Sequence, residues 1–216
     1  MEAQDALIQA ARAMNDLGIN QGKSGNISMR DGEGLWLTPS GVAYERMSAD
    51  DVVFMKMDGS WTCPNADMRP SSEWRFHLDI MKARPDVNAV VHSHPIAATA
   101  VACLRRAIPA FHYMVAVAGG KFIPLAQYAT FGSEELSHNV LTAMGDLNAC
   151  LLANHGMIAC APDPETALSI AVEVEALAAQ YIKALAVEEP AILDDEEMDR
   201  VLAKFNAGYG YASVEG

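Results

Sequence analysis

Two histidines that stand two residues apart, His92 and His94, offer the clearest chemistry in this chain. They end a β-branched run that begins at Val87 and predicts a strand, and side chains two apart in a strand project from the same face. Two imidazoles on one face can bind one divalent ion together. The alternative is a structural pair at a strand end, with both rings hydrogen-bonded to backbone or solvent.

A third histidine, His155, lies in an Asn-His-Gly turn between two apolar segments, 149–153 and 157–161. A polar ring at such a turn needs its own partner, because burying an unpaired polar group costs free energy. Three imidazoles leave one position of a tetrahedral zinc ion open, which is the arrangement of a catalytic Lewis-acid site. The three histidines together therefore predict a zinc centre.

Glu73 is the obvious fourth group, at the expected N-terminus of a helix. Its structural alternative is complementarity to the helix dipole, which on its own would account for an acid at this position. His77 stands one turn further along, at the i, i+4 spacing of many metal-binding helices. We interpret His77 as structural, packed beneath the site or paired with a neighbour, and His112 and His138 as surface or interface histidines.

Three short polar segments, 22–26, 38–41 and the pair Ser71-Ser72, could surround a phosphate group. Their small residues expose backbone N–H and hydroxyl groups, and the serine pair precedes a helix whose N-terminus favours anions. Turns and helix caps use the same residue types. The segments therefore indicate a phosphate site only if the fold brings them together.

The elements that must position these groups are a mixture of helices and strands. Apolar spacing and capping residues predict helices over 2–17, between Glu73 and Pro85, over 95–106, from Pro164 onward, and after the acidic segment 188–197. Apolar runs predict strands over 35–38, 51–57, 87–92, 149–153 and 157–161, with a hairpin turn at Asp58-Gly59. Hairpins beside helical crossovers favour a mixed or antiparallel sheet in one α/β unit.

Composition excludes several classes of protein. Fifteen basic and 28 acidic residues give the 216-residue chain a net charge of −13, which disfavours nucleic acid and anionic membranes as general partners. The 51% hydrophobic content suits one globular domain, and no repeat or composition break marks a second. The first residues include acids rather than a basic leader, and no stretch approaches the roughly 18 apolar residues that span a bilayer. We therefore expect a cytoplasmic protein.

A series of motifs resembles the class II aldolase/adducin family in the same order. The motifs are G-K-S-G-N-I-S, L-T-P-S-G, P-S-S-E-W-R-F-H, A-V-V-H-S-H-P, I-P-A-F-H-Y-M-V-A-V-A-G-G, Y-A-T-F-G-S-E-E-L and L-A-N-H-G. The resemblance runs from Gly18 to Tyr209, which is nearly the whole chain. It implies a single three-layer α/β/α domain over residues 1–216, with a mixed, largely antiparallel central sheet. It also implies a homotetramer with zinc sites at the subunit interfaces.

The resemblance assigns roles to residues in this sequence. Carried over by position, His92, His94 and His155 bind zinc, and Glu73 ligates the resting metal and serves as acid and base during turnover. Tyr113, reaching in from a neighbouring subunit, matches the proton donor to the aldehyde oxygen.

The remaining carried-over positions would bind the substrate. The phosphate-binding positions are Gly25, Asn26, Ser40, Gly41, Ser71 and Ser72, and the residues on the aldehyde side are Phe131 and Tyr209. Lys23 departs from the family, which has a small or hydroxylated residue there, so its charge either meets the phosphate or points to solvent. The match carries one extra residue just before Tyr209.

The implied activity is zinc-dependent cleavage of a ketose 1-phosphate, such as L-fuculose 1-phosphate, to dihydroxyacetone phosphate and a small aldehyde. A 5-deoxy- or 5-(methylthio)-pentulose 1-phosphate is the second candidate substrate. The same fold also suits an epimerase, decarboxylase or dehydratase acting on a phosphorylated sugar, and a non-enzymatic interaction module like the adducin head domains. Glu73 argues against the epimerase, whose relatives carry aspartate, and the three histidines argue against the interaction module.

Overall fold

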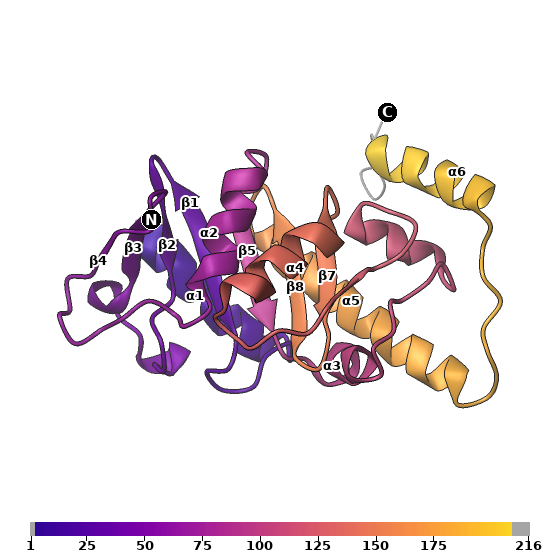
Figure 1. Cartoon of the computed structure of the whole chain (residues 1–216), viewed down its shortest axis with the longest axis horizontal. Coiled ribbons are helices and arrows are strands. Elements are labelled where there is room, and N and C mark those ends of the chain that lie inside the picture. The colour runs from indigo at the N-terminus through magenta and orange to yellow at the C-terminus, as the bar shows by residue number, and fades with distance from the viewer. Residues whose placement is uncertain (1–2, 209–216) are drawn as a thin grey trace, which may run out of the picture.

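One mixed sheet forms the centre of the molecule. The computed structural model describes residues 3–208, and within them eight strands pair in the order β4-β3-β2-β1-β5-β8-β7-β6 (Figure 1). The strands are β1 (Asn26–Asp31), β2 (Gly34–Leu37), β3 (Val53–Lys56), β4 (Trp61–Thr62), β5 (Ala89–Ser93), β6 (Leu125–Ala126), β7 (Ala149–Leu152) and β8 (Gly156–Ala161). Neighbouring strands run antiparallel except for the parallel pair β6 and β7. The prediction of a mixed, largely antiparallel sheet is confirmed.

Helices cover both faces of this sheet, so the fold has three layers. The helices are α1 (Ala3–Asp16), α2 (Trp74–Ala83), α3 (Ile96–Cys103), α4 (Glu134–Met144), α5 (Pro164–Leu185) and α6 (Asp195–Asn206). The apolar sides of α1, α3 and α5 pack in one core, and those of α2 and α4 pack in a second core on the opposite face. None of the described helices is long and apolar enough to cross a membrane.

Strand β5 shows how the sheet serves both cores. All of its residues are buried, with Ala89 and Val91 in the α1, α3 and α5 core and Val90 in the α2 and α4 core. Fully burying a side chain of valine size stabilises the fold by about 1.5–3 kcal/mol. Because the side-chain period of a strand is two, this apolar pattern fixes His92 on the same face as Val90, toward α2.

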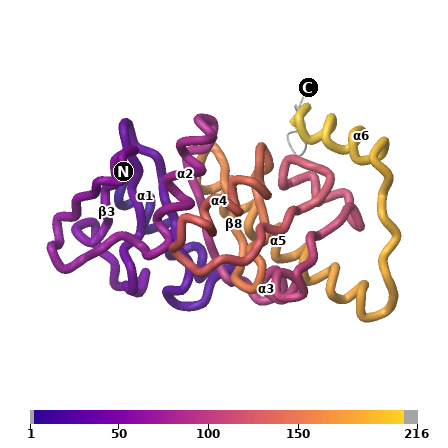
Figure 2. The backbone as a smooth tube through the Cα atoms, viewed as in Figure 1, coloured from indigo at the N-terminus to yellow at the C-terminus, as the bar shows by residue number. Residues whose placement is uncertain are grey.

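The C-terminal part of the described chain extends away from the sheet. Residues 186–194 run along the outside of the molecule from the end of α5 to α6 (Figure 2). Helix α6 packs on the 3₁₀ segment Tyr113–Ala118, and the backbone N–H of Leu193 donates to the carbonyl of Ala110 at 2.9 Å. The end of the acidic segment is the first turn of α6, where its charges complement the helix dipole.

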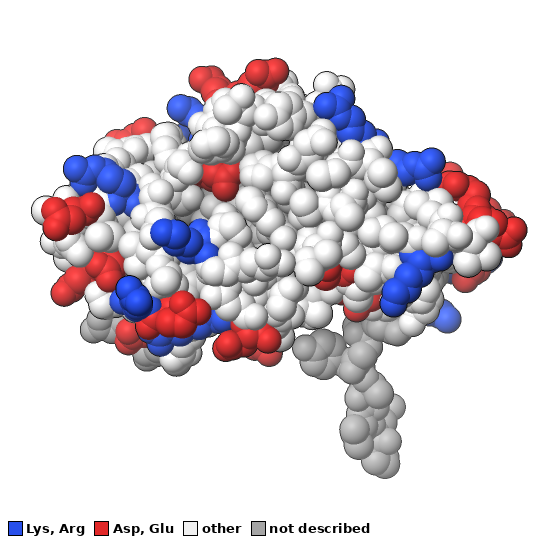
Figure 3. Space-filling model, turned by 90° about the horizontal axis from the view of Figure 1, so that it is seen from below, with Lys and Arg blue, Asp and Glu red and all other residues white. Residues whose placement is uncertain are grey.

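Charge on the surface is dispersed. Figure 3 shows acidic and basic side chains interspersed around the outline of one face, with a broad middle region of mostly uncharged residues. The net charge of −13 is therefore not gathered in one patch on that face.

Four of the described strands and α-helices are absent from the sequence-based expectation: β1, α4, and the two-residue strands β4 and β6. Strand β1 carries the polar residues Asn26 and Ser28 in buried positions, so its sequence lacks the alternation of apolar and polar residues that predicts a strand. Helix α4 begins at a Ser133 cap, whose hydroxyl accepts from the N–H of Leu136, and it buries Leu136, Val140 and Met144 at helical spacing, so the signal was present in the sequence. Several boundaries also differ by one to three residues: the helix expected over 95–106 ends at Cys103, and the strands expected from residues 51 and 87 begin at Val53 and Ala89.

Candidate metal centre

Three parts of the fold bring potential ligands to one end of the sheet. His92 is in β5 and His94 directly follows that strand, His155 lies in the turn between β7 and β8, and Glu73 is the N-cap of α2. Antiparallel pairing of β5 with β8 sets Ser93 opposite Met157, so the turn that carries His155 lies beside the end of β5. One ligand atom from each of the four residues lies within 4.8 Å of the others.

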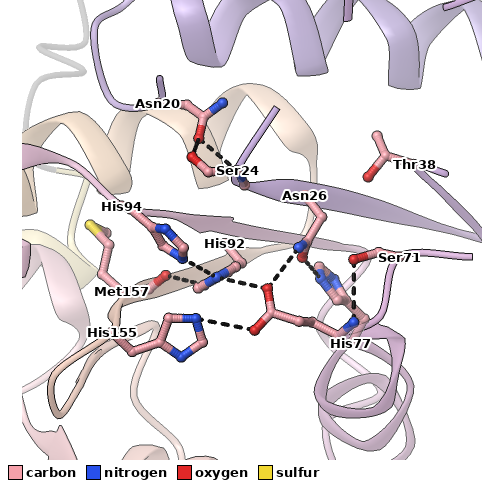
Figure 4. A network of polar contacts seen from close by, with 12 residues as sticks. Asn20, Ser24, Asn26, Thr38, Ser71, His77, His92, His94, His155 and Met157 are labelled. Atoms are coloured by element: carbon pink, nitrogen blue, oxygen red, sulfur yellow. Dashed lines mark hydrogen bonds and ion pairs between the residues drawn. The ribbon is translucent and has the colours of Figure 1, made fainter. Parts of the chain in front are cut away.

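The atoms of this cluster face one another (Figure 4). Glu73 Oε2 lies 3.1 Å from His92 Nε2, and Glu73 Oε1 lies 3.1 Å from His155 Nε2. The Nε2 atoms of His92 and His94 are 2.9 Å apart. His92 Nδ1 lies 2.9 Å from the carbonyl oxygen of Met157, to which it donates, so its Nε2 lone pair points into the cluster.

The electrostatics of the cluster favour metal-binding protonation states. Burial alone would raise the pKa of Glu73, but the adjacent His92 and His155 rings hold that pKa below its usual range, so the carboxylate is ionised. Burial, with the neighbouring His92 and His155 rings, lowers the pKa of His94 to about 4. A neutral imidazole and an ionised carboxylate are the forms that ligate a metal.

The residues present fit a divalent ion. Glu73 Oε1 is buried without a hydrogen-bond partner of good geometry, although the His155 ring nitrogen is near it. The Nε2 atom of His92 also carries a lone pair, because its Nδ1 donates to Met157, and the His94 Nε2 atom lies only 2.9 Å from it. A cation bound among them would satisfy all of these lone pairs. Three imidazole nitrogens and one carboxylate oxygen are a donor set that suits zinc and related ions.

Beneath the cluster lies a second group of buried polar side chains. Asn26 Nδ2 donates to Glu73 Oε2 at 3.1 Å, and the other end of this amide meets His77 Nε2. His77 Nδ1 lies 2.8 Å from Ser28 Oγ, and burial lowers the pKa of His77 to about 3. His77 is therefore a neutral, fully paired ring that contributes no atom to the cluster, in agreement with its interpretation as structural.

A surface cavity of about 320 Å³ opens beside the four ligands. It is lined by Ser24, Ser72, Glu73, His94, Tyr128, Ala129, Phe131, Asn154 and His155. Sequence analysis named Ser72 and Phe131 for this region and included Ser24 in the expected phosphate segment 22–26. It missed Tyr128, Ala129 and Asn154, although each lies inside one of the family-like motifs. Larger hollows of the described chain lie between α1 and α5, beside Tyr113, and on the far side of Tyr128, where Arg105 and Gln127 line the third.

The three segments expected around a phosphate do converge. Pro39 and Pro70 form an isolated antiparallel bridge, and the N–H of Ser71 donates to the carbonyl of Thr38 at 3.1 Å. Lys23 Nζ donates to the carbonyl of Gly41 at 3.0 Å, which ties the first segment to the second. The Lys23 ammonium group thus lies at the junction of the two loops.

Gly25 and Asn26 sit more deeply than the rest of these segments. A Cβ atom at Gly25 would lie only 2.5 Å from the carbonyl oxygen of His92, so the close approach of the loop to β5 requires glycine. Both ends of the Asn26 amide are engaged by Glu73 and His77. A phosphate-binding role for these two residues stays a prediction.

Tyr113 is not near the metal-binding cluster of its own chain. It is 39% exposed, and it lines a hollow with Phe111 and residues of α6 such as Val201. Its expected action in the site of a neighbouring subunit stays a prediction. Tyr209 lies outside the described residues.

A single mixed sheet between two helical layers, with three imidazoles and a carboxylate at one end, defines a metal-dependent enzyme of the α/β class. The Class II Aldolase and Adducin N-terminal domain matches residues 5–182, and the chain belongs to this family. Within the family, its relatives identify it as an aldolase-type, metal-dependent lyase.

Known relatives are similar over nearly the whole chain. A 5-methylthioribulose-1-phosphate/5-deoxyribulose-1-phosphate aldolase of Rhodospirillum rubrum is 53% identical over 204 residues, which cover 94% of this chain and 90% of the relative. An L-fuculose phosphate aldolase of Escherichia coli is 47% identical over 205 residues, with 94% of each chain covered. The solved structure of an L-fuculose 1-phosphate aldolase superimposes with a TM-score of 0.91 at 38% identity, covering 95% of this chain and 98% of that one.

Proposed function

We propose that this protein is a zinc-dependent aldolase that cleaves a ketose 1-phosphate to dihydroxyacetone phosphate and a small aldehyde. The observation that carries the proposal is the cluster of Glu73, His92, His94 and His155, whose ligand atoms lie within 4.8 Å of one another beside an open cavity. The names of the relatives support the same reaction class.

The substrate phosphate would bind where the segments 38–41 and 71–72 meet. Ser72 lines the cavity just before the N-terminus of α2, where the positive end of the helix dipole favours an anion. Lys23 at the neighbouring loop adds one positive charge to a protein of net charge −13. This arrangement would hold the phosphate end of the ketose and direct its carbonyl carbon toward the histidines.

A zinc ion held by His92, His94 and His155 would act as a Lewis acid that stabilises negative charge on the substrate oxygens. Glu73 supplies the base for the synthetic direction, because its ionised carboxylate can take a proton from the hydroxymethyl carbon of dihydroxyacetone phosphate. Tyr113 of a neighbouring copy then gives its phenolic proton to the aldehyde oxygen as the carbon–carbon bond forms. Cleavage reverses both transfers, so Tyr113 takes the hydroxyl proton and Glu73 protonates the enediolate carbon.

The assembly follows from the position of Tyr113. This residue lies in a hollow beside α6, away from the ligands of its own chain, so the proposed proton transfer needs a second copy. We therefore propose a homotetramer in which active sites form between subunits.

A 5-deoxy- or 5-(methylthio)-pentulose 1-phosphate is the second candidate substrate. The mouth of the cavity carries two exposed aromatic residues, Tyr128 and Phe131, which suit an apolar tail on the aldehyde. The site would discriminate only weakly between aldehydes with different apolar tails, since one methylene changes the binding free energy by only about 1–3 kcal/mol in an apolar pocket. The 53% identical relative is named for substrates of this kind.

The test is a direct assay. Purified, zinc-loaded protein is offered L-fuculose 1-phosphate, 5-deoxyribulose 1-phosphate and 5-methylthioribulose 1-phosphate, and released dihydroxyacetone phosphate is measured. We expect turnover of at least one substrate, abolished by His92→Ala and retained in His138→Ala, which changes an exposed histidine of α4. Zinc-loaded protein that releases no dihydroxyacetone phosphate from any of them would refute the proposal.

A further inference from the structure

Four buried polar side chains form a continuous chain of contacts that ends at Glu73. Ser28 and His77 are fully buried, and Asn26 and Glu73 are 4% and 5% exposed. The order of contacts is Ser28 Oγ to His77 Nδ1 at 2.8 Å, His77 Nε2 to Asn26 Oδ1, and Asn26 Nδ2 to Glu73 Oε2 at 3.1 Å. Figure 4 labels Asn26 and His77, the two middle members of this chain. No ligand is needed to complete this chain.

Each hydrogen bond in the chain has only one possible direction. An ionised carboxylate can only accept, so the Asn26 amide must turn its NH₂ group toward Glu73 and its oxygen toward His77. The amide oxygen can only accept, so His77 must carry its proton on Nε2. The unprotonated Nδ1 then accepts from the hydroxyl of Ser28.

We propose that His77 is a positioning residue for Glu73 that acts through Asn26, with Ser28 fixing the tautomer of its ring. A neutral Nε2–H tautomer holds the amide in the one orientation that gives Glu73 Oε2 a donor. Without that N–H, the amide can rotate by half a turn and bring its oxygen against the carboxylate. Glu73 Oε2 would then lose its donor, and only the His92 and His155 rings would still hold the carboxylate.

The location of these residues suits such a role. His77 is one helical turn beyond Glu73 in α2, whereas Ser28 and Asn26 share one face of β1, which pairs with the strand that carries His92. The chain therefore links α2 to β1 directly beneath the ligands. The functional part of this inference rests on the proposed role of Glu73, but the direction of the hydrogen bonds does not.

The first experiment reads the tautomer in metal-free protein. Long-range ¹H–¹⁵N spectra distinguish the two neutral forms of a histidine ring, and we expect the Nε2–H form for His77 near neutral pH. The Nδ1–H form would overturn the inference, because it turns the Asn26 oxygen toward Glu73. This measurement needs no substrate, so it stands even if the protein proves to have a different activity.

The second experiment compares matched variants. Ser28→Ala and Ser137→Ala each remove a buried hydroxyl that contacts an α2 side chain, His77 in the first case and Asp79, at 2.7 Å, in the second. The readouts are zinc affinity and the rate at which dihydroxyacetone phosphate exchanges a carbon-bound proton with solvent. We expect Ser28→Ala to lower one or both and Ser137→Ala to leave both unchanged.

A stronger perturbation replaces the ring itself. Removing an outer-shell partner typically costs about 10–100-fold in metal affinity or activity, and we expect a loss of that size in His77→Leu without a change in KM. His77→Gln retains a donor and an acceptor and should recover part of the loss. The inference fails if Ser28→Ala and Ser137→Ala have the same zinc affinity and exchange rate, or if His77→Leu and His77→Gln lose the same amount of activity. His77 would then only fill space. If His77→Leu does not fold, the serine pair decides the question.

Discussion

A methyl group at Gly156 should disturb the metal centre more than the rest of the fold. Gly156 begins β8 directly after His155, and a Cβ atom there would lie 2.5 Å from the carbonyl oxygen of Ser93 and 2.6 Å from Cδ2 of His94. Ordinary contact begins at 3.4 Å, so the backbone near the histidines must move by about 0.9 Å. Metal–ligand distances tolerate only about 0.2 Å.

Gly120→Ala is the matched control for Gly156→Ala. Its nearest neighbour is also at 2.5 Å, but that atom is the end of the Leu147 side chain, which can rotate away. Crowding of a packed interior costs about 1–3 kcal/mol, and for a chain of this size each kcal/mol lowers Tm by about 2–4 °C. We expect Gly156→Ala to lose about 1–3 kcal/mol of stability, measured by thermal unfolding with and without zinc. We also expect it to lose at least tenfold in zinc affinity, measured by metal competition. Zinc affinity equal to that of Gly120→Ala would refute the reasoning.

Four further changes test other parts of the site. His155→Ala should remove bound zinc and nearly all turnover, measured by metal analysis and aldolase assay against His138→Ala; full activity without metal would contradict the zinc assignment. Glu73→Gln should still bind phosphate ligands but should not exchange the dihydroxyacetone phosphate proton, and normal exchange would dismiss Glu73 as the base. Tyr113→Phe should lose cleavage while keeping exchange, whereas equal loss of both would make its role structural. Burial holds the pKa of His77 at about 3 against 6.5 when exposed, so the unfolded chain binds this proton first and stability declines as pH falls through that window. Between these two pKa values, this one ring makes the free energy of unfolding fall by about 1.4 kcal/mol for each unit by which the pH is lowered. In His77→Gln the free energy of unfolding should therefore fall less steeply with decreasing pH, and an unchanged pH dependence would contradict the assignment.

Local sequence patterns predicted the parts of this fold whose residues have one dominant role. The run that ends at His92 is buried on both faces of β5, and the Asp163 cap and Pro164 begin α5 as expected. Strand β1 escaped prediction because Asn26 and Ser28 serve the polar chain beneath Glu73 rather than an apolar core. The hydrogen-bonding residues in the buried positions of this strand thus removed the apolar alternation by which strands are predicted.

The sequence named the four residues of the metal-binding cluster, but it could not show that they meet. His92 and His94 lie two residues apart at the end of β5, so the sequence alone shows that they are close. The approach of Glu73 and His155 depends instead on the crossovers that place α2 and the β7–β8 turn at the same end of the sheet. The convergence of the phosphate segments is likewise a property of the topology. Tyr113 depends on contacts between subunits, which a single chain does not contain.

The wide spacing of the ligands along the chain has a consequence for biosynthesis. About 80 residues separate Glu73 from His155. Bringing the ends of so long a loop together costs conformational entropy, which the contacts of the folded sheet offset. During translation His155 leaves the ribosome well after the His92 and His94 pair, so the full ligand set exists only once β7 and the turn after it have been made. A complete ligand set thus requires synthesis of at least the first 155 residues, and a product truncated before His155 lacks one of the four ligands.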